Sequence, residues 1–462
     1  MKRRVLAAFL VLATLFSLAV VPAYAADVAA TENVTDPDST ACGCGCGKKL
    51  SEVEWKPWTG EVASGHFYLT EDQTIAEATN VISGESVVLD LRGHTITTSA
   101  RVRTFLVNGY LGVLDTVGGG RISGRTVSGD NGGLVYVADN ETTGSTFELF
   151  SGTLTPATDA GKPNSGGLIG LGDGATFRMH DGLLLNGVTG SGSSKNGGAI
   201  SAGATSTIEI LGGSIVGCSA DAVGGNIYSS GAVTLKNCAI IGGTAGSTGG
   251  NLYISGTLTA ENCTIAGGTA MATGTYGGGN INTASGSKLT FTNCDIYGGY
   301  CPGYGGNISF GWGTQTLKNT KVYGGVSGKG GDNIALTHAS ANMTLDGCTV
   351  DGGMARVLGK LTLKGATKIN LTSGGLDISE QGSKTTVATG LTSGAEVYVS
   401  GNKTLTGSLN YIKPALNCTL TASGTTLTVA PAADGVEAGY CPTAVKRLPG
   451  SLMAQRVQPI HI

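Results

Sequence analysis

Residues 233–243 read Val-Thr-Leu-Lys-Asn-Cys-Ala-Ile-Ile-Gly-Gly. In the first half of this stretch, apolar Val233 and Leu235 alternate with polar residues, which is the two-residue period of a β-strand with one buried face. The glycine pair at the end tolerates positive φ angles and indicates a tight turn. The stretch therefore predicts a short strand, a bend at Asn237, and a second short segment that ends in a turn.

This pattern recurs through most of the chain. Its aligned apolar residue occurs at nine positions, spaced 25 to 32 residues apart: Ile122, Leu154, Leu184, Ile215, Ile240, Ile265, Ile296, Val322 and Val350. A Gly-Gly-Asn-Ile element or a near copy precedes the later ones, at Gly224, Gly249, Gly278, Gly305 and Gly330. A unit of this length is too short for a propeller blade, and it has no helical or leucine-rich signature.

Such a unit suits one coil of a parallel β-helix, with about three strands and three turns. One coil cannot bury its apolar face alone, so successive coils have to stack. We therefore expect an all-β fold, a right-handed parallel β-helix built as a single-stranded solenoid. The right hand follows from the twist and crossover preference of parallel strands. The solenoid is predicted to span residues 60–432, with the clearest repeats at 197–353.

Stacking places equivalent residues of successive coils about 4.8 Å apart. Recurring asparagines should then form ladders in which each side-chain amide bonds the next. One ladder is expected at Asn237, Asn262, Asn293 and Asn319, and a second at Asn226, Asn251, Asn280, Asn307 and Asn333. The recurring cysteines Cys238, Cys263, Cys294 and Cys348 should point inward as reduced packing residues, with disulfides between neighbours as the alternative.

The composition agrees with strands and tight turns. Glycine supplies 78 of 462 residues, more than twice its usual share of about 7%. Collagen is excluded because glycine does not occupy every third position, and a disordered chain is excluded because 40% of the residues are hydrophobic. The formal net charge of −3 argues against nucleic acid as a partner.

The N-terminus has the features of a secretory signal peptide. Lys2, Arg3 and Arg4 precede the apolar run 5–21, and Ala-Tyr-Ala at 23–25 fits a cleavage site. We expect residues 1–25 to be removed and the protein to be secreted or displayed at the cell surface, with no membrane span after cleavage. The remaining segments are expected to be a linker at 26–59 and a loose tail at 433–462.

Two parts of the chain resemble known families. The segment 87–96, Val-Val-Leu-Asp-Leu-Arg-Gly-His-Thr-Ile, resembles the entry coil of secreted bacterial right-handed parallel β-helix proteins of the pectate-lyase-like superfamily. The Gly-Gly-Asn-Ile and Gly-Gly-Ala-Ile elements are similar to one motif of polymorphic outer-membrane protein repeats, whose members act in adhesion. The resemblance covers roughly residues 60–430 and implies a fold more than an activity.

The segment 42–47 alternates cysteine with glycine. Cys42, Cys44 and Cys46 could hold a soft metal ion. Zinc sites, however, usually have longer gaps and need a fourth ligand, and no histidine lies nearby in the sequence. The alternative is a flexible segment whose thiols oxidise among themselves or with Cys418 and Cys441. The favoured interpretation has no metal and no cofactor.

Groups for glycan cleavage do not stand out. Hydrolases need paired carboxylates, and lyases need carboxylate-bound Ca²⁺ with a basic residue. The catalytic candidates are Lys329, Asp332 and His338, for which a solvated turn is the alternative. Arginines in the first coils could clamp an anionic glycan or form a solvated charged face. The binding candidates among these arginines are Arg101, Arg103 and Arg121.

One zone is rich in aromatic residues, and we expect its rings to form an outward binding face, with core filling as the alternative, above all for Trp312. These binding candidates are Tyr297, Tyr300, Tyr304, Trp312 and Tyr323. Tyr297 and Tyr323 share one repeat position, and alternation places both outside, where rings can stack on sugars. We therefore expect a non-catalytic protein that binds an extracellular polysaccharide or a host or neighbouring cell surface. The alternatives are a polysaccharide lyase, hydrolase or epimerase, and a structural spacer of a surface protein.

Overall fold

The computed structural model describes residues 36–60, 63–139, 144–352, 355–369, 376–377, 386–392, 396–400, 418–423 and 426–431. The expected signal peptide and C-terminal tail lie outside these residues. The chain divides into two compact units. Unit 1 is Met1–Thr259 with Cys263–Thr269, and unit 2 is Ala260–Asn262 with Ala270–Ile462. Among the described residues, no helix combines the length and the apolar character that crossing a membrane requires.

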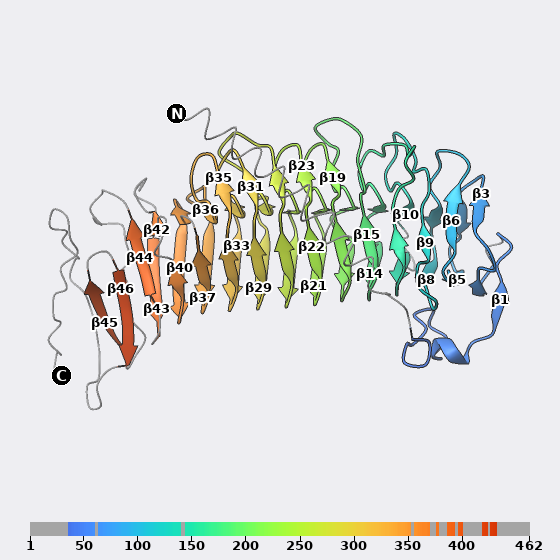
Figure 1. The fold of residues 1–462 in the computed structure, drawn as a ribbon, viewed down its shortest axis with the longest axis horizontal. Coiled ribbons are helices and arrows are strands. Elements are labelled where there is room, and N and C mark those ends of the chain that lie inside the picture. The colour runs from blue at the N-terminus through green and yellow to red at the C-terminus, as the bar shows by residue number, and fades with distance from the viewer. Residues whose placement is uncertain are drawn as a thin grey trace. The chain divides into compact units, whose positions relative to one another are not determined.

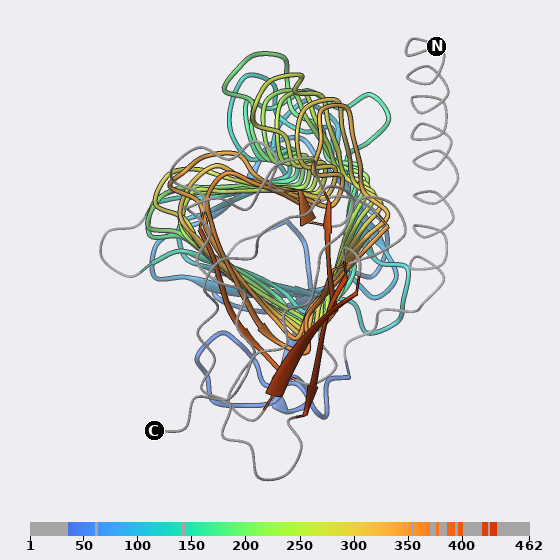
Figure 2. The same ribbon diagram turned by 90° about the vertical axis from the view of Figure 1, so that its left-hand side faces the viewer.

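Each unit is a parallel β-helix, as expected from the repeats. The chain runs through a strand of a first sheet, then a second sheet, then a third, and returns to the first one coil later (Figure 1). Viewed along the stack in Figure 2, the coils within a unit project as a closed, three-sided outline. Successive strands of each sheet pair in parallel, because the chain always returns in the same direction.

The first sheet consists in unit 1 of β1 (Trp55–Pro57), β2 (Gly65–Tyr68), β5 (Ser86–Asp90), β8 (Tyr110–Leu114), β11 (Thr146–Leu149), β14 (Thr176–Met179), β17 (Thr207–Ile210) and β21 (Ala232–Lys236). Its strands in unit 2 are β29 (Lys288–Thr292), β33 (Thr314–Lys318), β37 (Asn342–Asp346), β40 (Lys360–Gly365) and β43 (Thr386–Leu391). Strand β25 (Thr257–Glu261) contains residues of both units.

The second sheet consists in unit 1 of β3 (Gln73–Ile75), β6 (Thr95–Thr98), β9 (Arg121–Ile122), β12 (Thr153–Leu154), β15 (Leu183–Leu185), β18 (Ser214–Val216), β22 (Ala239–Ile241) and β26 (Thr264–Ala266). Its strands in unit 2 are β30 (Asp295–Tyr297), β34 (Lys321–Tyr323), β38 (Thr349–Asp351), β41 (Lys368–Ile369) and β44 (Glu396–Ser400). An antiparallel hairpin of β45 (Cys418–Ser423) and β46 (Thr426–Pro431) pairs with β44.

The third sheet consists in unit 1 of β4 (Thr79–Val81), β7 (Phe105–Val107), β10 (Val135–Val137), β13 (Ile169–Leu171), β16 (Ile200–Ala202), β20 (Ile227–Ser229) and β24 (Leu252–Ile254), and in unit 2 of β28 (Ile281–Thr283), β32 (Ile308–Phe310), β36 (Ile334–Leu336), β39 (Ala355–Val357) and β42 (Leu376–Asp377). A short fourth sheet follows the second in later coils: β19 (Ser219–Ala220), β23 (Thr244–Ala245), β27 (Thr269–Ala270), β31 (Tyr300–Cys301) and β35 (Val326–Ser327).

The core is formed by the inward residue of each strand, as the alternation predicts. All nine register residues from Ile122 to Val350 are fully buried. They pair with their counterparts one coil away, as Ile240 does with Ile265 and Ile296 with Val322. Burial of each such side chain contributes about 1.5–3 kcal/mol relative to an exposed one. The repeating pattern is therefore the main source of stacking energy.

The inward cysteines are confirmed as packing residues. Cys238, Cys263 and Cys294 are at most 5% exposed. Cys238 Sγ and Cys263 Sγ are 3.5 Å apart, well beyond the S–S bond length of about 2.05 Å. The nine cysteines from Cys42 to Cys348 are all free thiols.

The second asparagine ladder is buried inside the coils. Asn226 Nδ2 donates to Asn251 Oδ1 at 2.7 Å in unit 1. In unit 2, Asn280 bonds Asn307 and Asn307 bonds Asn333, each at 2.8 Å. These amides are fully buried. Each has several partners, which is the condition under which a buried polar group does not destabilise the fold.

The first asparagine ladder lies at an exposed bend. Asn237, Asn262, Asn293 and Asn319 all have φ between 48° and 55°, in the left-handed region that asparagine tolerates better than most residues. Asn293 Nδ2 donates to Asn262 Oδ1 at 3.3 Å. The backbone conformation of the bend therefore explains why asparagine recurs here.

The N-terminal segment packs on the outer face of the first sheet of unit 1. Ala41 and Lys49 form an antiparallel bridge, and Leu50 begins the 3₁₀ helix η1 (Leu50–Glu52). Cys42 and Leu50 pack in one cluster with Val88, Leu114 and Phe150. The cluster covers an outward row of the sheet, which makes β5 buried on both faces.

Candidate functional site

The aromatic pair that alternation placed outside lies on the second sheet of unit 2. Tyr297 of β30 pairs with Tyr323 of β34, and Tyr323 pairs with Asp351 of β38. The two tyrosine rings stack with centroids 4.9 Å apart and planes within 10°. Tyr323 is 37% exposed and Asp351 is exposed. The row Tyr297, Tyr323 and Asp351, here called the aromatic row, therefore presents a ring beside a carboxylate.

The buried asparagine ladder fixes the backbone of the aromatic row. Asn280 Nδ2 donates to the carbonyl oxygen of Tyr297, and Asn307 Nδ2 donates to that of Tyr323, each at 2.8 Å. Asn333 makes the same bond to Asp351, also at 2.8 Å. Because these amides are fully buried, the exposed row is attached to a rigid support. A surface held in this way loses little conformational entropy on binding.

Charged side chains flank the aromatic row. The neighbouring outward positions pair Asp295 with Lys321, then Thr349, then Lys368. The pKa of Tyr323 is raised by partial burial and by the negative charge of Asp295. From β30 to β41 the two rows carry two carboxylates, Asp295 and Asp351, and two ammonium groups, Lys321 and Lys368, so charges of both signs lie on this face. Polar groups next to an exposed ring can hydrogen-bond a polar ligand while its apolar face stacks.

A second set of rings lies elsewhere in unit 2. The ring centroid of Trp312 lies 4.8 Å from that of Tyr276 and 5.3 Å from that of His338. Tyr276 and His338 are exposed, whereas Trp312 is half-buried. Sequence reasoning missed Tyr276, because it lies in an irregular segment without the repeat pattern. Trp312 is therefore part of a surface cluster, with its ring held between two neighbours.

The other two aromatic candidates are not on the aromatic row. Tyr300 belongs to β31 of the short fourth sheet and is 6% exposed. Its expected outward orientation is wrong, because no pattern in the sequence indicates that extra strand. Tyr304 is half-buried, with the guanidinium of Arg356 4.2 Å from the ring centroid. The ring of Tyr304 therefore contacts a cation of its own chain.

The catalytic candidates each contact different groups. Asp332 Oδ1 accepts hydrogen bonds from the amide and hydroxyl of Ser327, at 3.0 and 2.6 Å. Lys329 Nζ lies 5.9 Å from the ring centroid of Tyr304. His338 accepts a hydrogen bond from the Ser340 amide and contacts Trp312. Asp332 therefore caps a turn, which is what the solvated-turn interpretation of this segment predicts.

The arginine candidates are dispersed in unit 1. Arg103 forms an ion pair with Asp130 and also donates to the carbonyl of Asn131. Arg101 and Arg121 are exposed, and Arg121 donates to the carbonyl of Gly119. The charge of Arg103 is thus already neutralised within the fold, whereas those of Arg101 and Arg121 face solvent.

Carboxylates gather on an outward row of the first sheet in unit 1. Arg178 lies between Glu148 and Glu209 and pairs with both, at 3.4 and 2.7 Å. Glu148 also accepts hydrogen bonds from Tyr110, at 2.6 Å, and contacts His180 Nε2 at 2.6 Å. Burial favours a raised pKa for Glu148, but these hydrogen bonds and the charges of His180 and Arg178 outweigh it and lower the pKa.

This carboxylate cluster is not arranged for glycan cleavage. Glu148 is 2% exposed. Tyr110 of β8 and Gly43 of the N-terminal segment lie directly over it. A Cβ at position 43 would fall within 2.2 Å of both the Glu148 carboxylate and the Tyr110 hydroxyl oxygen. General acid–base catalysis needs a group that reaches the substrate. The position and partners of Glu148 instead make it a structural anion.

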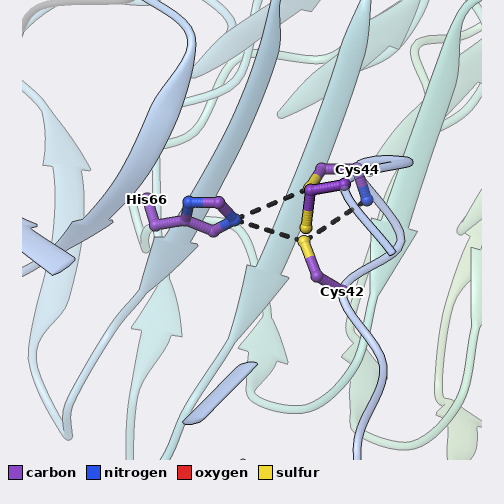
Figure 3. A group of neighbouring side chains, drawn as sticks. Cys42, Cys44 and His66 are labelled. Carbon is purple, nitrogen blue, oxygen red and sulfur yellow. Dashed lines mark hydrogen bonds between the residues drawn. The ribbon is translucent and has the colours of Figure 1, made fainter. Parts of the chain in front are cut away.

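The three alternating cysteines lie beside a histidine that is distant in sequence. Cys42 Sγ is 3.2 Å and Cys44 Sγ is 3.6 Å from His66 Nε2, and both sulfurs point toward the ring (Figure 3). Cys46 completes a group whose four ligand atoms all lie within 4.8 Å of one another. Sequence reasoning missed His66, because only the folding of β2 beside the cysteine segment brings it close.

Comparisons with protein-family models, curated proteins and solved structures find no match.

Proposed function

We propose that the protein is a secreted or cell-surface β-helix that binds carbohydrate, without turnover, on the aromatic row of unit 2. The observation that carries the proposal is the stacked pair Tyr297 and Tyr323 beside Asp351 on an exposed sheet. The leader-like segment 1–25 and the resemblance of residues 87–96 to secreted β-helix proteins support export.

The chemistry of the row suits a sugar. A pyranose has an apolar C–H face that stacks on an aromatic ring and hydroxyls that bond carboxylates. Tyr323 offers a ring that is 37% exposed, with Asp351 one coil away on the side opposite Tyr297. Since carboxylates and ammonium groups alternate beside the rings, a neutral glycan is favoured over a polyanion.

The test combines a glycan array with calorimetry on the glycans retained. The double variant Tyr297→Ala, Tyr323→Ala is expected to weaken binding by about 1–3 kcal/mol, the cost typical of losing aromatic anchors. Its melting temperature should stay nearly unchanged, because both rings lie outside the core. The matched control replaces the other stacked pair, Tyr228 and Tyr253 of unit 1, by alanine.

Two outcomes contradict this function. Binding that survives the double substitution, or that is lost equally in the Tyr228, Tyr253 control, places the site elsewhere. Release of new reducing ends or unsaturated products from a bound polysaccharide would show that the protein is a hydrolase or lyase.

A further inference from the structure

We propose that Cys42, Cys44, Cys46 and His66 bind one zinc ion in a closed Cys₃His site. Their ligand atoms all lie within 4.8 Å of one another. In tetrahedral zinc sites, Zn–S bonds of about 2.3 Å and Zn–N bonds of about 2.0–2.1 Å place the ligand atoms about 3.5–3.8 Å apart. The separations of 3.2 and 3.6 Å between the sulfurs of Cys42 and Cys44 and His66 Nε2 are close to these values.

The glycine that follows each cysteine explains how so short a spacing brings three thiols together. Gly45 and Gly47 have φ angles of 80° and 72°, which non-glycine residues rarely adopt. Gly43 has no room for a side chain, because Glu148 and Tyr110 lie against it. The loop is closed by the hydrogen bond from the Cys42 amide to the Lys48 carbonyl, at 2.9 Å. The segment is therefore a shaped loop, and its glycines let alternate side chains converge.

The surroundings of the group match those of a metal centre. His66 lies on β2, paired with Trp55 of β1 and Val88 of β5. The Trp55 ring packs edge-on against the imidazole, with ring centroids 5.6 Å apart, and this contact limits rotation of the imidazole. The amide of Cys44 donates to Cys42 Sγ at 3.4 Å, a contact that stabilises a thiolate ligand. The fourth ligand is thus held on a strand while the loop supplies the other three.

A zinc ion here would attach the N-terminal loop to the first sheet. Zn²⁺ with three thiolates and one neutral imidazole carries a net charge of −1, and Lys48 and Lys49 follow directly in the chain. Cys42 is buried with Leu50 in the cluster that covers Val88 and Leu114. With no ligand position left for water, the site is structural, and metal binding adds to the stability of the segment it closes.

The experiment uses the full chain, reduced and freed of metal with a chelator. Titration with zinc is expected to give one tightly bound ion per chain by elemental analysis. Co²⁺ as a probe should show the intense visible absorption of a tetrahedral thiolate site. His66→Ala should weaken zinc binding by at least about tenfold and change the Co²⁺ spectrum. Zinc should also slow proteolysis within residues 36–52.

The controls separate ligands from other thiols and from misfolding. Cys238→Ala removes a buried thiol outside the group and should leave the stoichiometry at one. Cys46→Ser changes an exposed ligand with little risk to folding and should lose tight binding while circular dichroism is unchanged. The proposal is overturned if the reduced protein takes up no zinc. It is also overturned if His66→Ala binds zinc as tightly as the parent, with the same Co²⁺ spectrum.

Discussion

The same place in the coil is filled by threonine, leucine or alanine in earlier coils of unit 1 and by asparagine in the later ones. Thr104, Leu134, Leu168 and Ala199 occupy this place first, and Asn226 and Asn251 follow. Backbone hydrogen bonds define the equivalent residues. The amide of each residue donates to the carbonyl of its equivalent one coil later, as from Leu168 to Ala199 and from Ala199 to Asn226. Every one of these side chains is fully buried. Burial alone therefore does not select asparagine.

The difference follows from a turn. Among the described coils, those with asparagine in this place are the ones that add a two-residue strand of the fourth sheet, such as β23 before Asn251. Asn251 Oδ1 accepts from the Gly243 amide, and its Nδ2 donates to the Ala266 carbonyl, each at 2.8 Å. Buried backbone groups need partners. Asparagine supplies them where the extra strand bends the chain, whereas leucine suffices where it does not.

The largest expected effect comes from breaking the ladder at Asn307. Replacement by leucine removes its bonds to Asn333, to the Tyr323 carbonyl and to the Gly299 amide. Each buried partner left without a bond costs about 1–3 kcal/mol. We expect Asn307→Leu to lower the unfolding free energy by about 3–5 kcal/mol, measured by chemical denaturation. The reverse change, Leu168→Asn, should also destabilise, because the earlier turn offers the amide no equivalent partners. If either substitution leaves the unfolding free energy unchanged, asparagine is not required by the turn that the extra strand creates.

A smaller effect distinguishes the two regions by pH. The ladder contains no titratable group, whereas the earlier coils carry Glu148 with a lowered pKa. A carboxyl with a lowered folded pKa contributes stability above its unfolded pKa of about 4.5, and this contribution is lost as the pH falls through the folded pKa. Unfolding free energy should therefore decline below about pH 4.5. The decline should be shallower in Glu148→Gln, which should cost about 1–3 kcal/mol at neutral pH. An identical acid profile in the variant would assign the decline to other groups.

The smallest effect concerns the exposed asparagines at the bend. Asn237 has a φ of 48°, so Asn237→Ala should cost about 1–2 kcal/mol through left-handed strain. Asn237→Gly, which removes that strain, should be nearly neutral. Chemical denaturation measures both unfolding free energies. If Asn237→Ala lowers the unfolding free energy as much as Asn307→Leu does, the exposed ladder stabilises the fold through hydrogen bonds rather than through backbone conformation.

The repeats made the fold predictable, because a residue such as Ile240 is determined by local alternation and recurs at each coil. The same alternation correctly placed Tyr297 and Tyr323 outside. Tyr300 was placed wrongly, since the two-residue strand that buries it has no pattern long enough to recognise. His66 could not be linked to Cys42 from the sequence, because their proximity arises only when β2 pairs beside the N-terminal loop. Local periodicity was readable, whereas the contacts of an irregular segment were not.

The ladder also bears on how such a chain changes length. Asn307 presents the same groups toward the coil before it as Asn333 presents toward Asn307, and each asparagine binds its own turn in the same way. A duplicated coil inserted between two asparagine-bearing coils would meet complementary groups at both of its edges. An insertion of part of a coil would shift every later amide out of register. In evolution or in the laboratory, this region can therefore grow or shrink by whole repeats, and each added repeat extends the exposed face that it carries.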